Sequence, residues 1–201
     1  AQVLSEIGRG RATFSEISSA LRGKKIAYSL SLLERAGFVR KAVPLGAPKG
    51  ARGHYEMGDA YLNFWYRVLA SDVASIEAGQ GAAVLRRRRE EWEKHVRWVF
   101  EEAARDHARR LVAAGTLPNK TLVGRWWRHD HGLDIEIDVL GIRGHHTTLI
   151  GGARWSAKPL PLSALTEMQP WVGHVPSPAA DILYVLWSRK GLDPEITRRG
   201  A

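Results

Sequence analysis

The chain has 201 residues, enough for one large domain or two small domains with hydrophobic cores of their own. It contains no cysteine, which excludes disulfides and thiolate metal sites, and no apolar run approaches the roughly 20 residues that a membrane-spanning helix needs. Lysine and arginine number 30 against 21 acidic residues, and the resulting net charge of +9 favours a polyanionic partner such as nucleic acid. We therefore expect a cytoplasmic protein with no membrane contact.

The first 57 residues have the pattern of a helix-turn-helix followed by two strands. A capping-box sequence, Thr13-Phe-Ser-Glu16, predicts the start of a first helix. Apolar residues at helical spacing predict a second helix over residues 24–36, with Gly37 at its end. Two strands and the basic, Pro- and Gly-containing loop between them are expected at residues 38–42, 54–56 and 43–53. These elements predict a winged helix-turn-helix domain.

The predicted winged helix carries candidate DNA contacts on its second helix and on its wing. In such folds the second helix presents residues to the major groove, and the wing touches phosphate or the minor groove. The candidates on the helix and the wing are Lys24, Lys25, Tyr28, Ser29, Lys49 and Arg52. Two other interpretations stay open, since winged helices also serve as protein-contact modules and lysines on a helix face are often simply solvated.

Residues 58–83 are expected to connect two domains. Asp59 is placed to cap a helix whose face of Tyr61, Phe64, Trp65 and Val68 would form the seam between the domains. Residues 70–81, rich in Ser, Ala and Gly, predict an irregular linker. The domains are then a winged helix at residues 1–57, a connecting helix and linker at 58–83, and a second domain at 84–201.

The second domain is predicted to run helix, strand, strand, strand, helix, strand. A long helix through Val112 follows the arginine run at residues 86–89, which we expect to be solvated or to contact phosphate. The strands are expected at residues 121–127, 133–139, 147–155 and 181–187. The last of them is apolar enough to be buried on both faces. This order is typical of a mixed sheet with helices on its faces, an α+β or α/β fold.

The strands at residues 133–139 and 147–155 are expected to form a hairpin with a polar turn at 141–146. Because side chains alternate along a strand, the first strand should place its apolar and acidic residues on opposite faces: Leu133, Ile135, Ile137 and Val139 against Asp134, Glu136 and Asp138. On the second strand Gly152 and Arg154 share a face, and the hairpin would set Asp138 beside it. Carboxylates at this spacing suit a divalent cation.

Five stretches of the chain are similar to those of one protein family: Asp59-Ala-Tyr-Leu-Asn-Phe-Trp-Tyr66, Phe100-Glu101, Val123-Gly-Arg-Trp-Trp127, Glu136-Ile-Asp138-Val139 and Gly151-Gly-Ala-Arg-Trp-Ser156. Together they resemble the C-terminal region of archaeal-type DEXX-box ATPases. That region is a winged helix followed by a DUF234-type domain of the PD-(D/E)XK, or restriction-endonuclease-like, superfamily. Such domains carry an Asp on one strand, an acid-x-Lys pair on the next, and often a Glu on the preceding helix.

The resemblance implies a site at which two of four positions depart from the pattern. Asp138 matches the metal-binding Asp and Glu101 the helix acid, whereas Gly152 and Arg154 stand in place of the acid and the Lys. Magnesium or manganese would then bind at Asp138 and Glu101. Gly152 offers no ligand, and an arginine cannot be deprotonated to act as a general base. The candidate catalytic residues are therefore Glu101, Glu136, Asp138 and Arg154, with Arg154 and Lys158 also placed to bind DNA phosphate.

From this we expect the DNA-associated C-terminal portion of an archaeal-type ATPase, with a nuclease-like domain of impaired catalysis and duplex DNA as its partner. The chain starts at Ala1 and has no Gly-x-x-x-x-Gly-Lys-Ser/Thr loop, so the ATPase domain is expected upstream and no ATP hydrolysis here. In one alternative, a displaced acid (Glu136 or Glu167) with Lys158 restores a magnesium-dependent endonuclease. In the other, the chain is a regulatory or oligomerisation module without nucleic-acid contact.

Overall fold

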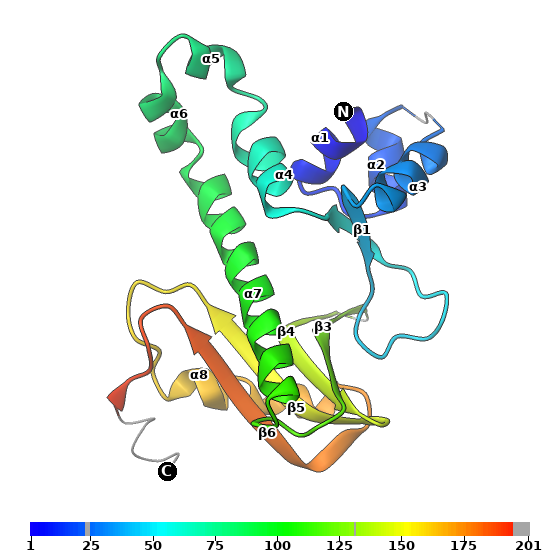
Figure 1. The fold of residues 1–201 in the computed structure, drawn as a ribbon, viewed down its shortest axis with the longest axis vertical. Coiled ribbons are helices and arrows are strands. Elements are labelled where there is room, and N and C mark those ends of the chain that lie inside the picture. The colour runs from blue at the N-terminus through cyan, green and yellow to red at the C-terminus, as the bar shows by residue number, and fades with distance from the viewer. Residues whose placement is uncertain (23–24, 131, 195–201) are drawn as a thin grey trace. The chain divides into compact units, whose positions relative to one another are not determined.

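The computed structural model describes residues 1–22, 25–130 and 132–194 (Figure 1). It has a mixed α+β fold with two compact units, one made of Ala1–Val43 and Gly50–Val96, the other of Pro44–Lys49 and Arg97–Ala201. The units reflect packing and do not test the domain boundaries predicted at residues 57 and 83. Of the helices in the described part of the chain, none combines the length and the apolar character that crossing a bilayer requires.

The first unit begins with three short helices and a two-stranded antiparallel sheet. These elements are α1 (Gln2–Gly8), α2 (Phe14–Ala20), α3 (Ala27–Arg35), β1 (Val39–Ala42) and β2 (His54–Met57). The predicted capping box is confirmed, since Thr13 accepts a hydrogen bond from the N–H of Glu16 at 3.2 Å and donates its own N–H to the Glu16 carboxylate at 2.8 Å. Helix α1 was not predicted. It adds Leu4 and Ile7 to the core of this unit.

Four short helices follow β2, and they correct the predicted linker. They are α4 (Ala60–Phe64), the π-helical turn η1 (Trp65–Leu69), α5 (Val73–Glu77) and α6 (Gly81–Arg87). Asp59 caps α4 as predicted, accepting from the N–H of Leu62 at 3.0 Å. The irregular linker predicted over residues 70–81 is wrong, because α5 lies within it. Tyr61, predicted to be part of a buried face, is 65% exposed.

The arginine run before the long helix has a structural role that its charge alone did not indicate. Arg87 and Arg88 both donate to the carboxylate of Asp72, the latter at 2.7 Å from Nε to Oδ2. These guanidinium groups hold the pKa of Asp72 at about 2. Two of the four arginines therefore link the turn before α5 to the end of α6.

The long helix α7 (Arg89–Ala113) starts in the first unit and continues into the second. In the first unit its side chains pack on α4. Phe64 meets Trp92 edge to face with ring centroids 5.4 Å apart, and the ring of His95 is 2.8 Å from the buried amide of Asn63. Burial lowers the pKa of His95.

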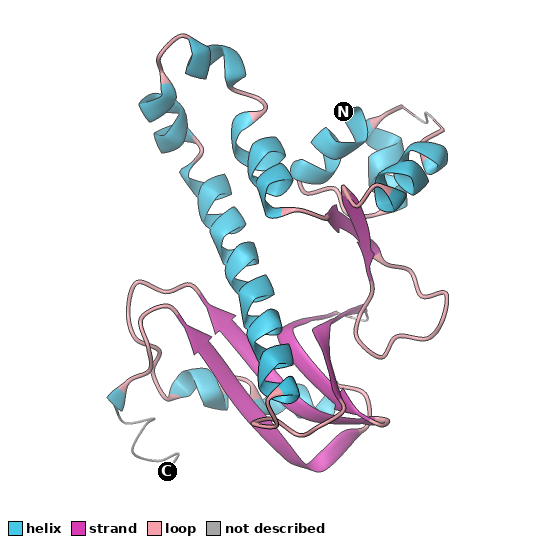
Figure 2. Cartoon of the chain, in the orientation of Figure 1, coloured by secondary structure: helices cyan, strands magenta, loops and turns pink. Residues whose placement is uncertain are grey.

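The second unit contains a four-stranded mixed sheet (Figure 2). Its strands lie in the order β3 (Thr121–Asp130), β4 (Leu133–Arg143), β5 (His146–Arg154) and β6 (Pro178–Ser188). The first three are antiparallel and β6 is parallel to β5, so the predicted mixed sheet is confirmed. The polar turn predicted at residues 141–146 is wrong, because β4 continues to Arg143 and only Gly144 and His145 turn. Strand β6 is an edge strand with no fully buried residue, so its predicted burial on both faces is also wrong.

Each face of this sheet has its own apolar cluster. On one face Ala104 and Ala108 of α7 pack with Val139 and Leu149. On the other, Met168 and its neighbours from the short helices α8 (Ser163–Thr166) and η2 (Gln169–Gly173) cover a cluster that includes Trp126, Ile137, Leu140 and Ile150. Apolar side chains thus cover both faces of the sheet.

Candidate functional site

Helix α7 brings an acidic and a positively charged side chain to one face of the sheet. Glu101 and Arg105 are four residues apart, which places them on the same side of the helix. Ala104 and Ala108 are buried against the strands, and their small side chains let the helix lie close to the sheet. Arg105 is only 4% exposed, and its Nη1 donates to the backbone carbonyl of Asp138 at 2.7 Å. The helix therefore contacts β4 directly at the predicted acidic position.

Strand β4 bulges at Asp138 and Val139. Its pairing with β3 shifts there, as the partners on each side indicate: Gly124 with Leu140 and Trp126 with Ile137. A bulge redirects the side chains that follow it. Val139 therefore packs in the cluster beneath α7, whereas Ile137 packs in the cluster on the opposite face. The prediction that Ile137 and Val139 share one face is wrong for this reason.

The carboxylate of Asp138 lies just beyond the end of the backbone hydrogen-bond ladder between β4 and β5. The last regular pair before it is Val139 with Gly151. Beyond that pair, Asp138 Oδ2 accepts a hydrogen bond from the N–H of Ala153 and another from Nη1 of Arg154, both at 2.8 Å. The side chain of Asp138 is 14% exposed and that of Arg154 is 44% exposed. The structure thus brings Asp138 and Arg154 together in a charged hydrogen bond at the open end of the hairpin.

Glu101 is mostly buried beside this pair, and its ionisation is disfavoured. Burial raises the pKa of Glu101 to about 7, and the negative charges of Asp138 and Glu136 add to the rise, against Arg105 and Arg125, which lower it. The structure therefore gathers Glu101 and Asp138 in one electrostatic environment. Near neutral pH, Glu101 holds its proton for a large part of the time.

Gly152 and Arg154, the two positions that depart from the acid-x-Lys pattern, lie next to Asp138. A Cβ built on Gly152 would meet Leu186 and the sulfur of Met168 at 3.4 Å and the guanidinium carbon of Arg154 at 3.7 Å. These are ordinary contact distances, so lack of space does not explain the glycine. As it stands, Gly152 adds no oxygen to the site, and Arg154 adds a permanent positive charge.

The remaining predicted residues of this site lie at its margin. Glu136 is half exposed and accepts from Arg125 at 3.1 Å. Lys158 and Glu167 are exposed on the segment after β5. The structure describes Glu136 as part of the charge environment of Glu101 and gives no contact of Lys158 or Glu167 with Asp138.

The predicted DNA-binding residues of the first 57 positions are largely exposed. Lys25 lies just before α3, and Tyr28 on that helix is 73% exposed, while Ser29 is half-buried. Lys49 and Arg52 are exposed, and Lys24 lies outside the described residues. Lys49 belongs to the segment Pro44–Lys49, which is part of the second unit. Within that unit the N–H of Leu45 donates to the carbonyl of Arg125 at 2.8 Å. The predicted wing is therefore hydrogen-bonded to β3 near its start.

The potential metal ligands around Asp138 fit the predicted magnesium or manganese ion poorly. The binding of this ion stays a prediction. A hard divalent cation needs several oxygen ligands in their ionised form. Asp138 Oδ2 already accepts two hydrogen bonds, one from a cation, and Glu101 retains its proton to neutral pH. Within residues 1–22, 25–130 and 132–194, no three histidine or acidic side chains are grouped so as to hold a metal ion.

Sequence reasoning missed Arg105, which holds the bulge from the helix side. Its position offered a signal, since Arg105 follows Glu101 by one helical turn and falls between Ala104 and Ala108 on the apolar stripe. A charged residue in that position is normally paired. Arg67, described below, was missed because the π-helical turn that carries it has no recognised sequence signal.

Comparison with known protein families identifies the group to which the chain belongs. A family model, DUF234, described as archaea bacterial proteins of unknown function, matches residues 65–165, half of the chain. The chain belongs to the DUF234 family. The match confirms the DUF234 part of the predicted resemblance, and it covers Glu101, Asp138 and Arg154.

A relative of this DUF234 chain is an uncharacterized protein of Methanocaldococcus jannaschii. It is 26% identical over 139 residues, which cover 67% of this chain and 31% of that protein. The chain therefore spans about a third of the length of this curated relative. No solved structure matches the chain.

Proposed function

We propose that this DUF234 chain is the DNA-associated part of an archaeal-type ATPase, a winged helix joined to a restriction-endonuclease-like domain whose cleavage activity is impaired. One observation carries the impaired catalysis: the Arg154 guanidinium lies 2.8 Å from the Asp138 carboxylate. In a metal-assisted nuclease the carboxylates converge on a divalent cation. Here the Arg154 guanidinium is the cation paired with the Asp138 carboxylate.

The chemistry left to these residues is binding and not bond cleavage. A guanidinium keeps its proton at all physiological pH values, so Arg154 cannot activate water. It can hold a phosphate oxygen, since it is 44% exposed and uses only Nη1 toward Asp138. Gly152 supplies no acid in support.

The first unit supports the winged-helix part of the proposal. Its order of three helices and two antiparallel strands is that of a winged helix, with α3 as the helix that would enter the major groove. Lys25 and Tyr28 are exposed at the front of α3. The net charge of +9 supports a polyanionic partner.

DNA binding is tested by the mobility of a duplex at increasing salt. We expect retardation at low salt that weakens steeply as salt rises, because lysines and arginines on phosphates displace condensed counterions. Lys25→Gln should weaken binding to all duplex sequences and lower the log–log salt slope by about 1. Lys120→Gln, the same charge change on an exposed residue before β3, is the matched control and should change neither quantity by as much.

Failure to retard any duplex at low salt would end the DNA proposal. The regulatory alternative would then be tested by adding the chain to the ATPase and measuring ATP turnover.

Cleavage is tested with supercoiled plasmid in magnesium or manganese. We expect no metal-dependent nicking by the wild type. The double variant Gly152→Glu with Arg154→Lys reinstates the acid-x-Lys pair at a position where a Cβ meets its neighbours at ordinary contact distances, and it is expected to gain a magnesium-dependent rise in melting temperature. Nicking by the wild type that Asp138→Ala abolishes would instead favour the active endonuclease, with Glu101, Glu136 and Asp138 as the acidic ligands.

A further inference from the structure

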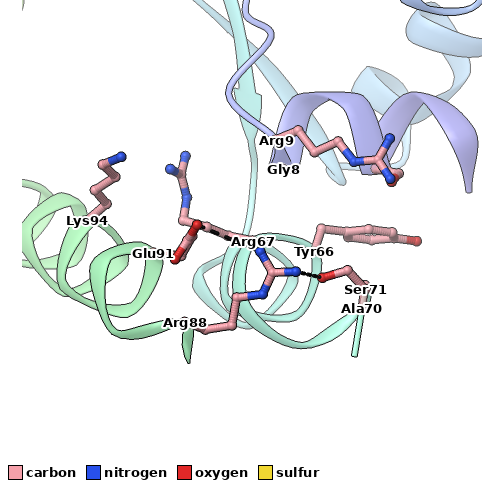
Figure 3. A pocket seen from close by; sticks show the side chains of 10 residues that line it. Gly8, Arg9, Tyr66, Arg67, Ala70, Ser71, Arg88, Glu91 and Lys94 are labelled. Atoms are coloured by element: carbon pink, nitrogen blue, oxygen red, sulfur yellow. Dashed lines mark hydrogen bonds and ion pairs between the residues drawn. The ribbon is translucent and has the colours of Figure 1, made fainter. Parts of the chain in front are cut away.

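The first unit contains a pocket of about 360 Å³ whose lining includes none of the residues of the candidate site around Asp138 (Figure 3). Its walls come from the end of α1, from η1 and the turn after it, and from the first turns of α7. The charged side chains that line it are Arg9, Arg67, Arg88, Lys94 and Glu91. Four cations therefore face one carboxylate, and this excess favours an anion as the occupant.

Three of the four cations form ion pairs with acids that are not among the residues lining the pocket. Arg9 pairs with Glu6 at 2.7 Å, and Lys94 pairs with Glu90 at 2.6 Å. Arg88 pairs with Asp72 at 2.7 Å, donates to the hydroxyl of Ser71 at 2.6 Å, and lies 3.7 Å from Glu91. Arg9 and Lys94 remain more than half exposed, so their ion pairs leave them open to a further anion.

Arg67 is different from the other three. Its Nε is buried, and in the part of the chain that the structure describes this atom has no hydrogen-bond partner. Burial lowers the pKa of Arg67, against the charge of Glu91, which raises it. A buried guanidinium donor without an acceptor is costly. An anion in the pocket that Arg67 lines would supply a compensating charge for this guanidinium.

The local backbone places Arg67 in this position. It lies in η1, a π-helical turn closed by the N–H of Ala70 on the carbonyl of Trp65 at 2.8 Å. Single π-helical turns of this kind occur frequently at functional sites. A Cβ added to Gly8 would lie 2.5 Å from the Cβ of Tyr66, so only glycine lets α1 lie this close to η1. The close approach puts Arg9, which follows Gly8, on the wall of the same pocket as Arg67.

We propose that this pocket binds the phosphate group of a small phosphorylated molecule, with the half-buried Arg67 as the central cation and Arg9, Arg88 and Lys94 as the other cations of the lining. The donors come from three separate segments, and a tetrahedral phosphate can accept from several directions, whereas a carboxylate accepts mainly in one plane. The volume admits a phosphate ester or diphosphate. This site is independent of Asp138 and of the proposed DNA contacts.

Pyrophosphate is the probe for this site, in thermal shift and titration calorimetry on the full chain. We expect it to raise the melting temperature, compared with chloride at equal ionic strength. Arg67→Met should weaken its binding by at least about tenfold, and Lys94→Gln by about threefold, because each removes a charged donor. Arg86→Gln removes the same charge from an exposed residue of α6 outside the pocket and should leave the affinity unchanged.

Three results would overturn the proposal. The first is no response of the wild type to about 10 mM pyrophosphate, because a specific site would bind pyrophosphate at that concentration. The second is an equal loss of affinity in Arg67→Met, Lys94→Gln and Arg86→Gln, which would indicate unspecific charge attraction. The third is a lack of pyrophosphate binding together with weaker duplex retardation in Lys94→Gln, which would assign these cations to DNA. Lys94 is half exposed, so its variant tests the site even if Arg67→Met fails to fold.

Discussion

Replacing Arg105 by methionine is expected to lower the free energy of unfolding by about 3 kcal/mol, because a buried charge pair loses one partner. The side chain of Arg105 is 5% exposed and holds Glu102 at 2.6 Å and the carbonyl of Asp138 at 2.7 Å. Methionine keeps most of the apolar stem but removes the guanidinium that donates to these two acceptors. Urea denaturation monitored by circular dichroism measures the difference.

Arg109→Met is the matched control for this prediction. Arg109 pairs with Asp106 three residues earlier, as Arg105 does with Glu102, but both members of this pair are about half exposed. An exposed pair of this kind contributes under about 1 kcal/mol, so the control should be close to wild type. If Arg105→Met also stays within about 0.5 kcal/mol of the wild type, the bulge at Asp138 does not depend on α7.

The features that could be predicted from the sequence are those fixed by neighbouring residues. The Thr13 capping box, the Asp59 cap and the alternation of helix and strand each depend on side chains within one turn or one strand. They needed no knowledge of tertiary contacts.

The hairpin illustrates what the sequence could not supply. A turn over residues 141–146 would set Asp138 opposite Leu149, whereas the two-residue turn and the shift at Gly141 and Ile142 set Val139 opposite Gly151. Only this register brings the Asp138 carboxylate to Arg154. Arg105, which donates to the carbonyl of Asp138 in this arrangement, is 33 residues from it along the chain. The two-residue alternation along a strand cannot predict a contact between residues so far apart in the sequence.

The edge position of β6 was missed for a related reason. A run such as Asp181-Ile-Leu-Tyr-Val-Leu-Trp187 is typical of a central strand, but its burial depends on which strand lies beyond it. In this sheet β5 lies on one side of β6, and no described strand lies on the other. Composition therefore predicted the strand correctly and its burial wrongly.

Glu101→Gln is expected to remove a fall in stability that the wild type shows as pH rises. The pKa of Glu101 is about 7 in the folded chain, above its ordinary value of 4.5, so between these values the folded state holds a proton that the unfolded state has released. The stabilisation by this proton is complete below pH 4.5 and is lost as pH rises through 7. Glutamine resembles the protonated acid at every pH. The variant should therefore gain on the wild type with rising pH, by up to about 3 kcal/mol.

Denaturation of the wild type and the variant across this pH range measures the gain directly. Because other groups titrate too, the difference between the two proteins is the informative quantity. Glu167→Gln, which removes an exposed carboxylate, should follow the wild type at every pH. The carboxyl carbon of Glu101, followed by NMR, should titrate with a midpoint near 7. A midpoint at the ordinary value, with parallel stability curves for the two proteins, would mean that water reaches Glu101 freely and that the site beside Asp138 is open.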